Sequence, residues 1–130
     1  MNPLSKFDLD LQFGQRGERW LEWLGTPEAK VEIKTERDSW QITGNACFEF
    51  ECRGKPSGVA VTESDFWVHI FVADNRVCLA FIWPVEYLKH FLRKAYVEPK
   101  LYGARLVQGG DDKASKILLI PISQLYLIGY

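Results

Sequence analysis

Charged and apolar side chains alternate in two short stretches of the chain. In "KVEIKTE", Glu32 and Lys34 lie two positions apart, and in "ACFEFECR", Glu49 and Glu51 have the same spacing. Because side chains two positions apart point to the same side of a β-strand, each pair is predicted to share one face of its strand. Carboxylates and an ammonium group presented in this way have the composition of a metal-dependent hydrolytic site.

The chemistry requires that the two strands lie side by side. Glu32 and Glu49, with Glu51 as a third, would then offer hard oxygen ligands, which suit Mg²⁺ or Mn²⁺. A metal held in this way polarises a phosphate oxygen and makes water a better nucleophile. Lys34 would position that water or stabilise charge on the phosphorus. The alternative is an ordinary pair of half-exposed strands, in which a Glu–Lys pair contributes about 0.2–1 kcal/mol.

Composition excludes several classes of protein. The 130 residues are 47% apolar and 25% charged, which is typical of a globular protein and predicts one domain over residues 1–130. No apolar run approaches the roughly 20 residues of a membrane helix, and the first residues show no secretory signal, so we expect a cytoplasmic protein. Three cysteines without a Cys-x-x-Cys motif, and two isolated histidines, argue against structural zinc.

Charge is divided unevenly along the chain. Residues 1–65 carry 12 acidic and 8 basic side chains, whereas residues 66–130 carry 5 acidic and 8 basic ones. An acidic cluster beside a basic surface would suit a metal site next to a phosphate track. A scatter of charges over a solvated surface explains the same numbers.

The elements that must position these side chains can be predicted from periodicity. A helix is expected near "FGQRGERWLEWLG", where Gly25 and Pro27 end it. Its apolar stripe consists of Phe13, Gly17, Trp20, Leu21 and Leu24. The apolar stretches "FWVHIFV" and "RVCLAFIW" predict two buried strands, joined by a turn at Asp74 and Asn75.

A second helix is predicted after Pro84, and it ends at Glu98 and Pro99. Its predicted apolar stripe consists of Tyr87, Leu88, Phe91, Leu92 and Ala95. The last stretch, "YGARLVQGGDDKASKILLIPISQLYLIGY", predicts a strand, a Gly/Asp-rich loop, a strand that ends before Pro121, and a short terminal helix or strand. This order of elements indicates an α/β or α+β domain with one mixed sheet covered by helices.

Four stretches in order, "GQRGERWL", "VEIKTERD", "TGNACFEFECRGKPSG" and "TESDFWVHIF", resemble small phage- and bacteria-borne endonuclease-like proteins of the PD-(D/E)XK nuclease superfamily. The later "RLVQGGDDKASKILLIPISQL" resembles the closing strand of such proteins, so the likeness runs from about Gly14 to Leu125. The resemblance implies an α/β, restriction-endonuclease-like fold with a mixed central sheet flanked by helices. It also implies hydrolysis of DNA phosphodiester bonds with Mg²⁺ (or Mn²⁺).

The family places a Glu on its first helix, a separate acidic residue on one strand, and an acidic-x-Lys motif on a neighbouring strand. Glu18 matches the helical Glu, and Glu32 with Lys34 matches the acidic-x-Lys motif. No Asp lies between Glu18 and Glu32 to supply the separate acid. Either Glu49 or Glu51 supplies it from the following strand, or Glu32 is the separate acid and "EFE" replaces the motif.

The resemblance therefore gives a set of expected site residues. The predicted catalytic residues are Glu18, Glu32, Lys34 and Glu49, and the predicted metal ligands are Glu32, Glu49 and Glu51. The predicted nucleic-acid contacts are Ser57, Thr62, Lys89, Arg93 and Lys94. A solvated helix face explains the three cations equally well. Two alternatives remain open: a nucleic-acid- or protein-binding module on the same fold without chemistry, and a homodimer through the apolar tail "QLYLIGY", which fits either function.

Overall fold

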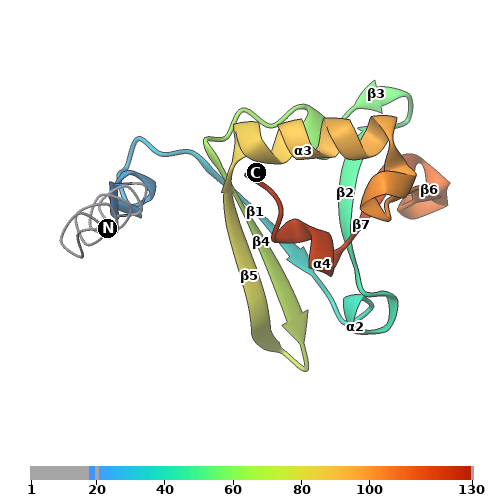
Figure 1. Ribbon diagram of the computed structural model, residues 1–130, viewed down its shortest axis with the longest axis horizontal. Coiled ribbons are helices and arrows are strands. Elements are labelled where there is room, and N and C mark those ends of the chain that lie inside the picture. Colours follow the sequence, from blue (N-terminus) through green and yellow to red (C-terminus); the bar gives the residue numbers. More distant parts are fainter. Residues whose placement is uncertain (1–17, 20, 130) are drawn as a thin grey trace, which may run out of the picture. The chain divides into compact units, whose positions relative to one another are not determined.

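The computed structural model describes residues 18, 19 and 21–129 of the chain (Figure 1). The chain divides into two units, Met1–Lys30 and Val31–Tyr130. In the larger unit the strands form two separate sheets.

The smaller unit contains the described part of the first predicted helix. Residues 18–19 and 21–24 are helical, in agreement with the sequence pattern. The backbone N–H of Gly25 donates to the carbonyl oxygen of Leu21 at 3.0 Å, and the helix ends there. Three residues of the predicted apolar stripe, Phe13, Gly17 and Trp20, lie outside the described residues.

One sheet of the larger unit has three strands, β1 (Val31–Glu36), β4 (Phe66–Ala73) and β5 (Arg76–Pro84), in the order β1-β4-β5. β1 runs parallel to β4, and β5 runs antiparallel to it. Asp74 and Asn75 connect β4 to β5 with φ angles of 51° and 60°. Two consecutive positive φ values are the requirement of a two-residue type I′ hairpin turn, which the sequence pair predicted.

The other sheet is antiparallel throughout, with the order β3-β2-β7-β6. Its strands are β2 (Asn45–Cys52), β3 (Lys55–Pro56), β6 (Arg105–Gly109) and β7 (Ser115–Pro121). The predicted α/β class is confirmed at this coarse level. The predicted single mixed sheet is wrong for this structure, because β1 pairs with β4 and β2 pairs with β7, so the two charged strands belong to different sheets.

Helix α3 (Val85–Val97) spans from the end of β5 toward β2 and β7 (Figure 1). Pro84 precedes its first turn, as predicted, and its buried stripe is Val85, Leu88, Phe91, Leu92 and Ala95. The short helical elements are α2 (Trp40–Thr43), η1 (Gly58–Ala60), η2 (Pro99–Tyr102), η3 (Asp111–Lys113) and α4 (Ile122–Leu125). Among the described residues, no helix has the length and apolar character needed to span a membrane.

The core lies where the inner faces of the two sheets meet. Phe48 of β2 is 1% exposed, and its ring centroid lies 4.8 Å from that of His69 on β4. Trp67 and Trp83, opposite each other on β4 and β5, have ring centroids 6.5 and 6.4 Å from that of Phe48. These aromatic contacts join the sheets although no backbone ladder does.

Candidate functional site

Glu32 and Lys34 lie on one face of β1, as the alternation predicts. Lys34 is opposite His69 of β4, and Glu32 is opposite Trp67. Both side chains are exposed, and within the part of the chain that the structure describes neither has a hydrogen bond or an ion pair. The pair is therefore available to a ligand.

Glu36, the third residue on that face of β1, is buried and closes a chain of hydrogen bonds. The indole N–H of Trp67 donates to His69 Nδ1 at 3.0 Å, so the proton of the neutral ring sits on Nε2. That nitrogen lies 3.0 Å from Glu36 Oε1, to which it donates. The backbone N–H of Cys47 on β2 donates to the same oxygen at 2.6 Å. Glu36 thus links β4 in one sheet to β2 in the other.

The thiol of Cys47 interacts with the carboxylate of Glu36. Burial, followed by the charge of Glu36 and a hydrogen bond with it, raises the pKa of Cys47 to about 11, although the nearby Lys34 acts in the opposite direction. Because the thiolate is the reactive form of cysteine, we expect this residue to react slowly at neutral pH.

Glu49 is held by two serine hydroxyls. Ser57 Oγ donates to its Oε2 at 3.0 Å, and Ser115 Oγ donates to its Oε1 at 2.6 Å. Next to Ser57, Gly58 has a φ of +53°, and a Cβ at this position would collide with the carbonyl oxygen of Glu49. The carboxylate therefore ties β2, the loop before η1 and β7 together. Ser57, predicted to contact phosphate, is engaged in this internal bond.

Glu51 does not share a face with Glu49, and the predicted alternation is wrong here. The register shifts between them: Glu49 lies opposite Ile117, whereas Glu51 lies opposite Lys116. Adjacent residues of β7 point to opposite faces, so the two carboxylates diverge. Glu51 Oε2 instead pairs with Lys116 Nζ at 3.0 Å, which raises the pKa of that exposed amine.

A Mg²⁺ site needs several oxygen ligands in near-octahedral positions. Glu32 stands on one sheet, Glu49 accepts two internal hydrogen bonds on the other, and Glu51 faces away from Glu49. Across residues 18–19 and 21–129, no group of three His, Cys, Asp or Glu residues could hold a metal ion. The fit to Mg²⁺ or Mn²⁺ is therefore poor in the larger unit. Glu18, an exposed helical residue, belongs to the smaller unit.

The predicted cations cluster on α3. Lys89 Nζ donates to the backbone carbonyl of Thr62 at 3.0 Å. The Thr62 hydroxyl accepts the backbone N–H of Ser64 at 3.3 Å, so this residue also has an internal partner. Arg93 and Lys94 are exposed. In the described part of the chain, Arg93 has no hydrogen bond or ion pair.

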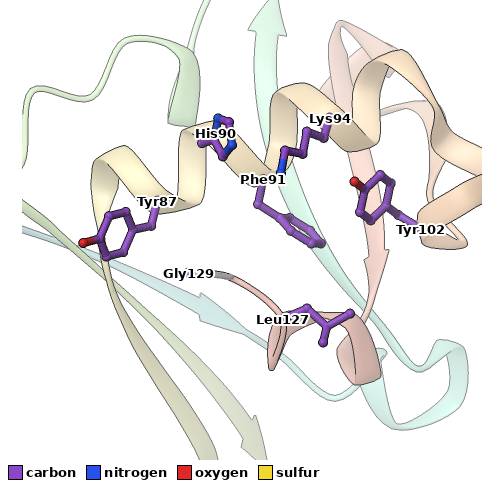
Figure 2. Close-up of a pocket in the computed structure, with 7 residues that line it drawn as sticks. All are labelled: Tyr87, His90, Phe91, Lys94, Tyr102, Leu127 and Gly129. Carbon is purple, nitrogen blue, oxygen red and sulfur yellow. The ribbon is translucent and has the colours of Figure 1, made fainter. Parts of the chain in front are cut away.

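Two pockets flank α3. The first, which we call the α3–β2 pocket, has a volume of about 650 Å³. Its lining comes from α3, β2, β7 and the β3–η1 segment, and it includes Lys89, Arg93, Tyr96, Phe50 and Glu51. The second has a volume of about 440 Å³. Figure 2 shows its lining, with Tyr87, His90, Phe91 and Lys94 along α3, and Tyr102, Leu127 and Gly129 around them.

Sequence reasoning missed the aromatic residues of these pockets. Tyr87 was predicted to belong to the buried stripe of α3 but is 42% exposed. Tyr96 follows Arg93 by three positions, a spacing that places both on one side of a helix, so it could have been found. Phe50 carried no such signal, because its position beside α3 depends on contacts between distant segments.

The C-terminal tail packs into the protein's own core. Leu125 is fully buried and Ile128 is 8% exposed, whereas Tyr126 and Leu127 are exposed. Two of the four described apolar side chains in the tail that suggested a dimer are thus already covered within one chain. The predicted homodimer stays a prediction.

The comparisons with known proteins give no relative from which a role could be transferred. The chain matches no family model, no curated protein and no solved structure. Membership of the PD-(D/E)XK superfamily therefore stays a prediction.

Proposed function

We propose that the protein is a module that binds nucleic acid without chemistry of its own, and that α3 contacts the phosphate backbone. The observation that carries this proposal is the gathering of cations on one helix. Between Glu86 and Glu98 the helix sequence "YLKHFLRKAYV" holds two lysines, an arginine and a histidine, and it contains no acidic residue. Cations of this kind neutralise phosphates and release their counterions on binding.

The overall charge limits how tight this binding is. The net charge of the chain is −1, so there is no large positive field to attract a polyanion. Binding must depend on a few local contacts, to which Arg93 and Lys94 contribute most, since Lys89 is partly engaged by Thr62. We therefore expect modest affinity and a shallow dependence on salt.

The test is the salt dependence of binding to a fluorescently labelled 12-nucleotide DNA, measured by anisotropy between 25 and 200 mM salt. We expect Arg93→Ala to weaken binding and to reduce the slope of log K against log salt by about 0.7, the contribution of one phosphate on a single strand. Arg76→Ala is the matched control. Arg76 is an exposed arginine at the hairpin end of β5, roughly 26 Å along the strand from the start of α3. Equal slopes for the two variants would refute the proposal.

The second candidate is the predicted metal-dependent endodeoxyribonuclease of restriction-endonuclease-like fold. One observation favours it: Glu32 and Lys34 are exposed on one face of β1 and lack partners in the described part of the chain. The described ligand set does not fit Mg²⁺, so we derive no step through a metal. Cleavage of supercoiled and branched DNA with Mg²⁺ or Mn²⁺ would support this candidate, provided that chelator abolishes it. The folded Glu32→Ala/Lys34→Ala variant must also lose the activity, whereas Glu28→Ala must keep it.

A further inference from the structure

We infer that the α3–β2 pocket receives one unstacked base of a single-stranded nucleic acid. Single strands are thus the ligand class of the nucleic-acid-binding function proposed above, and the inference rests on that function. The pocket is the larger of the two hollows beside α3, and its volume of about 650 Å³ lies within the range of about 300–1,000 Å³ typical of small-molecule sites. Its lining combines an apolar floor that includes the ring of Phe48, two further aromatic rings and three charged side chains.

The floor and one wall suit a flat aromatic group. Phe48, Leu92 and Leu118, which line the pocket, are each nearly fully buried. The ring of Tyr96 meets Phe50 edge to face, with centroids 5.6 Å apart, and Tyr96 remains 52% exposed. An exposed ring held in place by a second ring offers a stacking platform, and stacking accepts every base because every base has a π-face.

The charged groups at the pocket suit the rest of a nucleotide. Arg93, which lacks a partner in the described part of the chain, presents a guanidinium group that can take a phosphate in a bidentate manner. Glu51 Oε2 is engaged by Lys116 Nζ. Its Oε1 has no hydrogen bond among residues 18–19 and 21–129, so it can accept an amino proton from a base. Cytosine offers such a proton at N4, whereas thymine has no exocyclic amine.

A paired duplex uses this pocket only at a cost. A base inside a duplex is stacked and paired, and its extrusion costs a few kcal/mol, whereas extrusion of a base from a single strand costs less. The pocket therefore predicts a preference for single strands over duplexes, and for oligo(dC) over oligo(dT). The phosphate contacts of Arg93 and Lys94 alone predict neither preference.

The experiment compares anisotropy titrations of labelled dC12, dT12 and a 12-base-pair duplex. We expect Tyr96→Ala to weaken dC12 binding at least fivefold, whereas Tyr96→Phe stays within twofold of the parent and duplex binding is unchanged. Tyr126→Ala, which removes an exposed tyrosine that packs on Phe81 of β5 instead of lining the pocket, is the control and should change nothing. Glu51→Ala, which removes the acceptor, should abolish the preference for dC12 over dT12.

One outcome separates this inference from the proposed function. If Arg93→Ala weakens single strands and duplexes equally while Tyr96→Ala weakens neither, the helix binds nucleic acid and the pocket inference is overturned. NMR titration with cytidine monophosphate tests the pocket by itself. If this probe shifts the amide signals of Phe50, Leu92 and Tyr96 although no 12-mer binds, the pocket takes a free nucleotide, and the proposed function and the inference that rests on it are both refuted. Absence of both responses overturns both.

Discussion

Replacing Glu36 with alanine removes one acceptor that two donors from different sheets share. The Nε2–H of His69 on β4 and the backbone N–H of Cys47 on β2 both donate to Glu36 Oε1, at 3.0 and 2.6 Å. His69 is fully buried in the parent, so its ring has no direct access to bulk water when this partner is lost. The indole N–H of Trp67 already occupies Nδ1, so the ring cannot satisfy Nε2 by changing its tautomer.

The expected loss of stability follows from these two donors. A buried donor without a partner costs about 1–3 kcal/mol, and His69 should approach the upper part of this range. Cys47 N–H is only partly buried and recovers some hydration. Removal of a buried carboxylate also relieves its desolvation cost, which offsets part of the loss. We therefore expect Glu36→Ala to lower the free energy of unfolding by about 2–3 kcal/mol, out of the roughly 5–15 kcal/mol typical of a domain.

The assay is urea unfolding followed by tryptophan fluorescence, because Trp67 and Trp83 lie in the core beside His69. Glu36→Gln keeps an oxygen acceptor and should lose less than half as much. Glu32→Ala changes an exposed residue on the same face of β1 and should stay within about 0.5 kcal/mol of the parent. If Glu36→Ala were as stable as Glu32→Ala, Glu36 would not be a buried acceptor that joins the two sheets.

Three further predictions concern the loop at Glu49 and the thiols. Gly54 and Gly58 both have positive φ, but only at Gly58 would a Cβ collide with the Glu49 backbone. Gly58→Ala should therefore destabilise the fold by at least about 1 kcal/mol more than Gly54→Ala, as measured by thermal unfolding. Equal effects would mean that the loop can move away from Glu49. Cys78 is exposed and should be alkylated by iodoacetamide at pH 8, whereas Cys47, with a pKa of about 11, should react only near or above pH 10, as peptide mapping would show. The pKa of Cys47 is raised above its unfolded value of about 9, so the stability that the neutral thiol contributes is present below pH 9 and is lost as the pH rises through 11. Cys47→Ala should lessen this decline in stability.

Local patterns predicted α3 and the β4–β5 hairpin correctly. The predicted burial of the second strand is wrong, because most of β5 is exposed, including Val77 and Ile82. For α3, Pro84 and the spacing of Leu88, Phe91, Leu92 and Ala95 were sufficient, because a helix is specified by residues three and four positions apart. For the hairpin, the Asp74–Asn75 pair was sufficient, because the turn depends on the conformational tolerance of those two residues.

The arrangement of the charged strands could not be read from the same patterns. Val31–Glu36 was expected beside the next charged strand, but it pairs with Phe66–Ala73, far along the chain. Glu49 and Glu51 diverge because the pairing of β2 with β7 shifts its register between them, and nothing in "EFE" signals that shift. Glu36 received no role from the sequence, since its burial depends on the distant His69 and on Cys47 of the other sheet.

The hairpin turn also sets an order in which the three-stranded sheet can assemble. The two strands that Asp74 and Asn75 connect can meet within microseconds, since only two residues separate them. β1 is synthesised earlier but must wait, because its parallel partner begins some thirty residues later and the intervening chain has to close as a loop first. During synthesis, the strand that bears Glu32 and Lys34 therefore leaves the ribosome before its pairing partner β4 has been made.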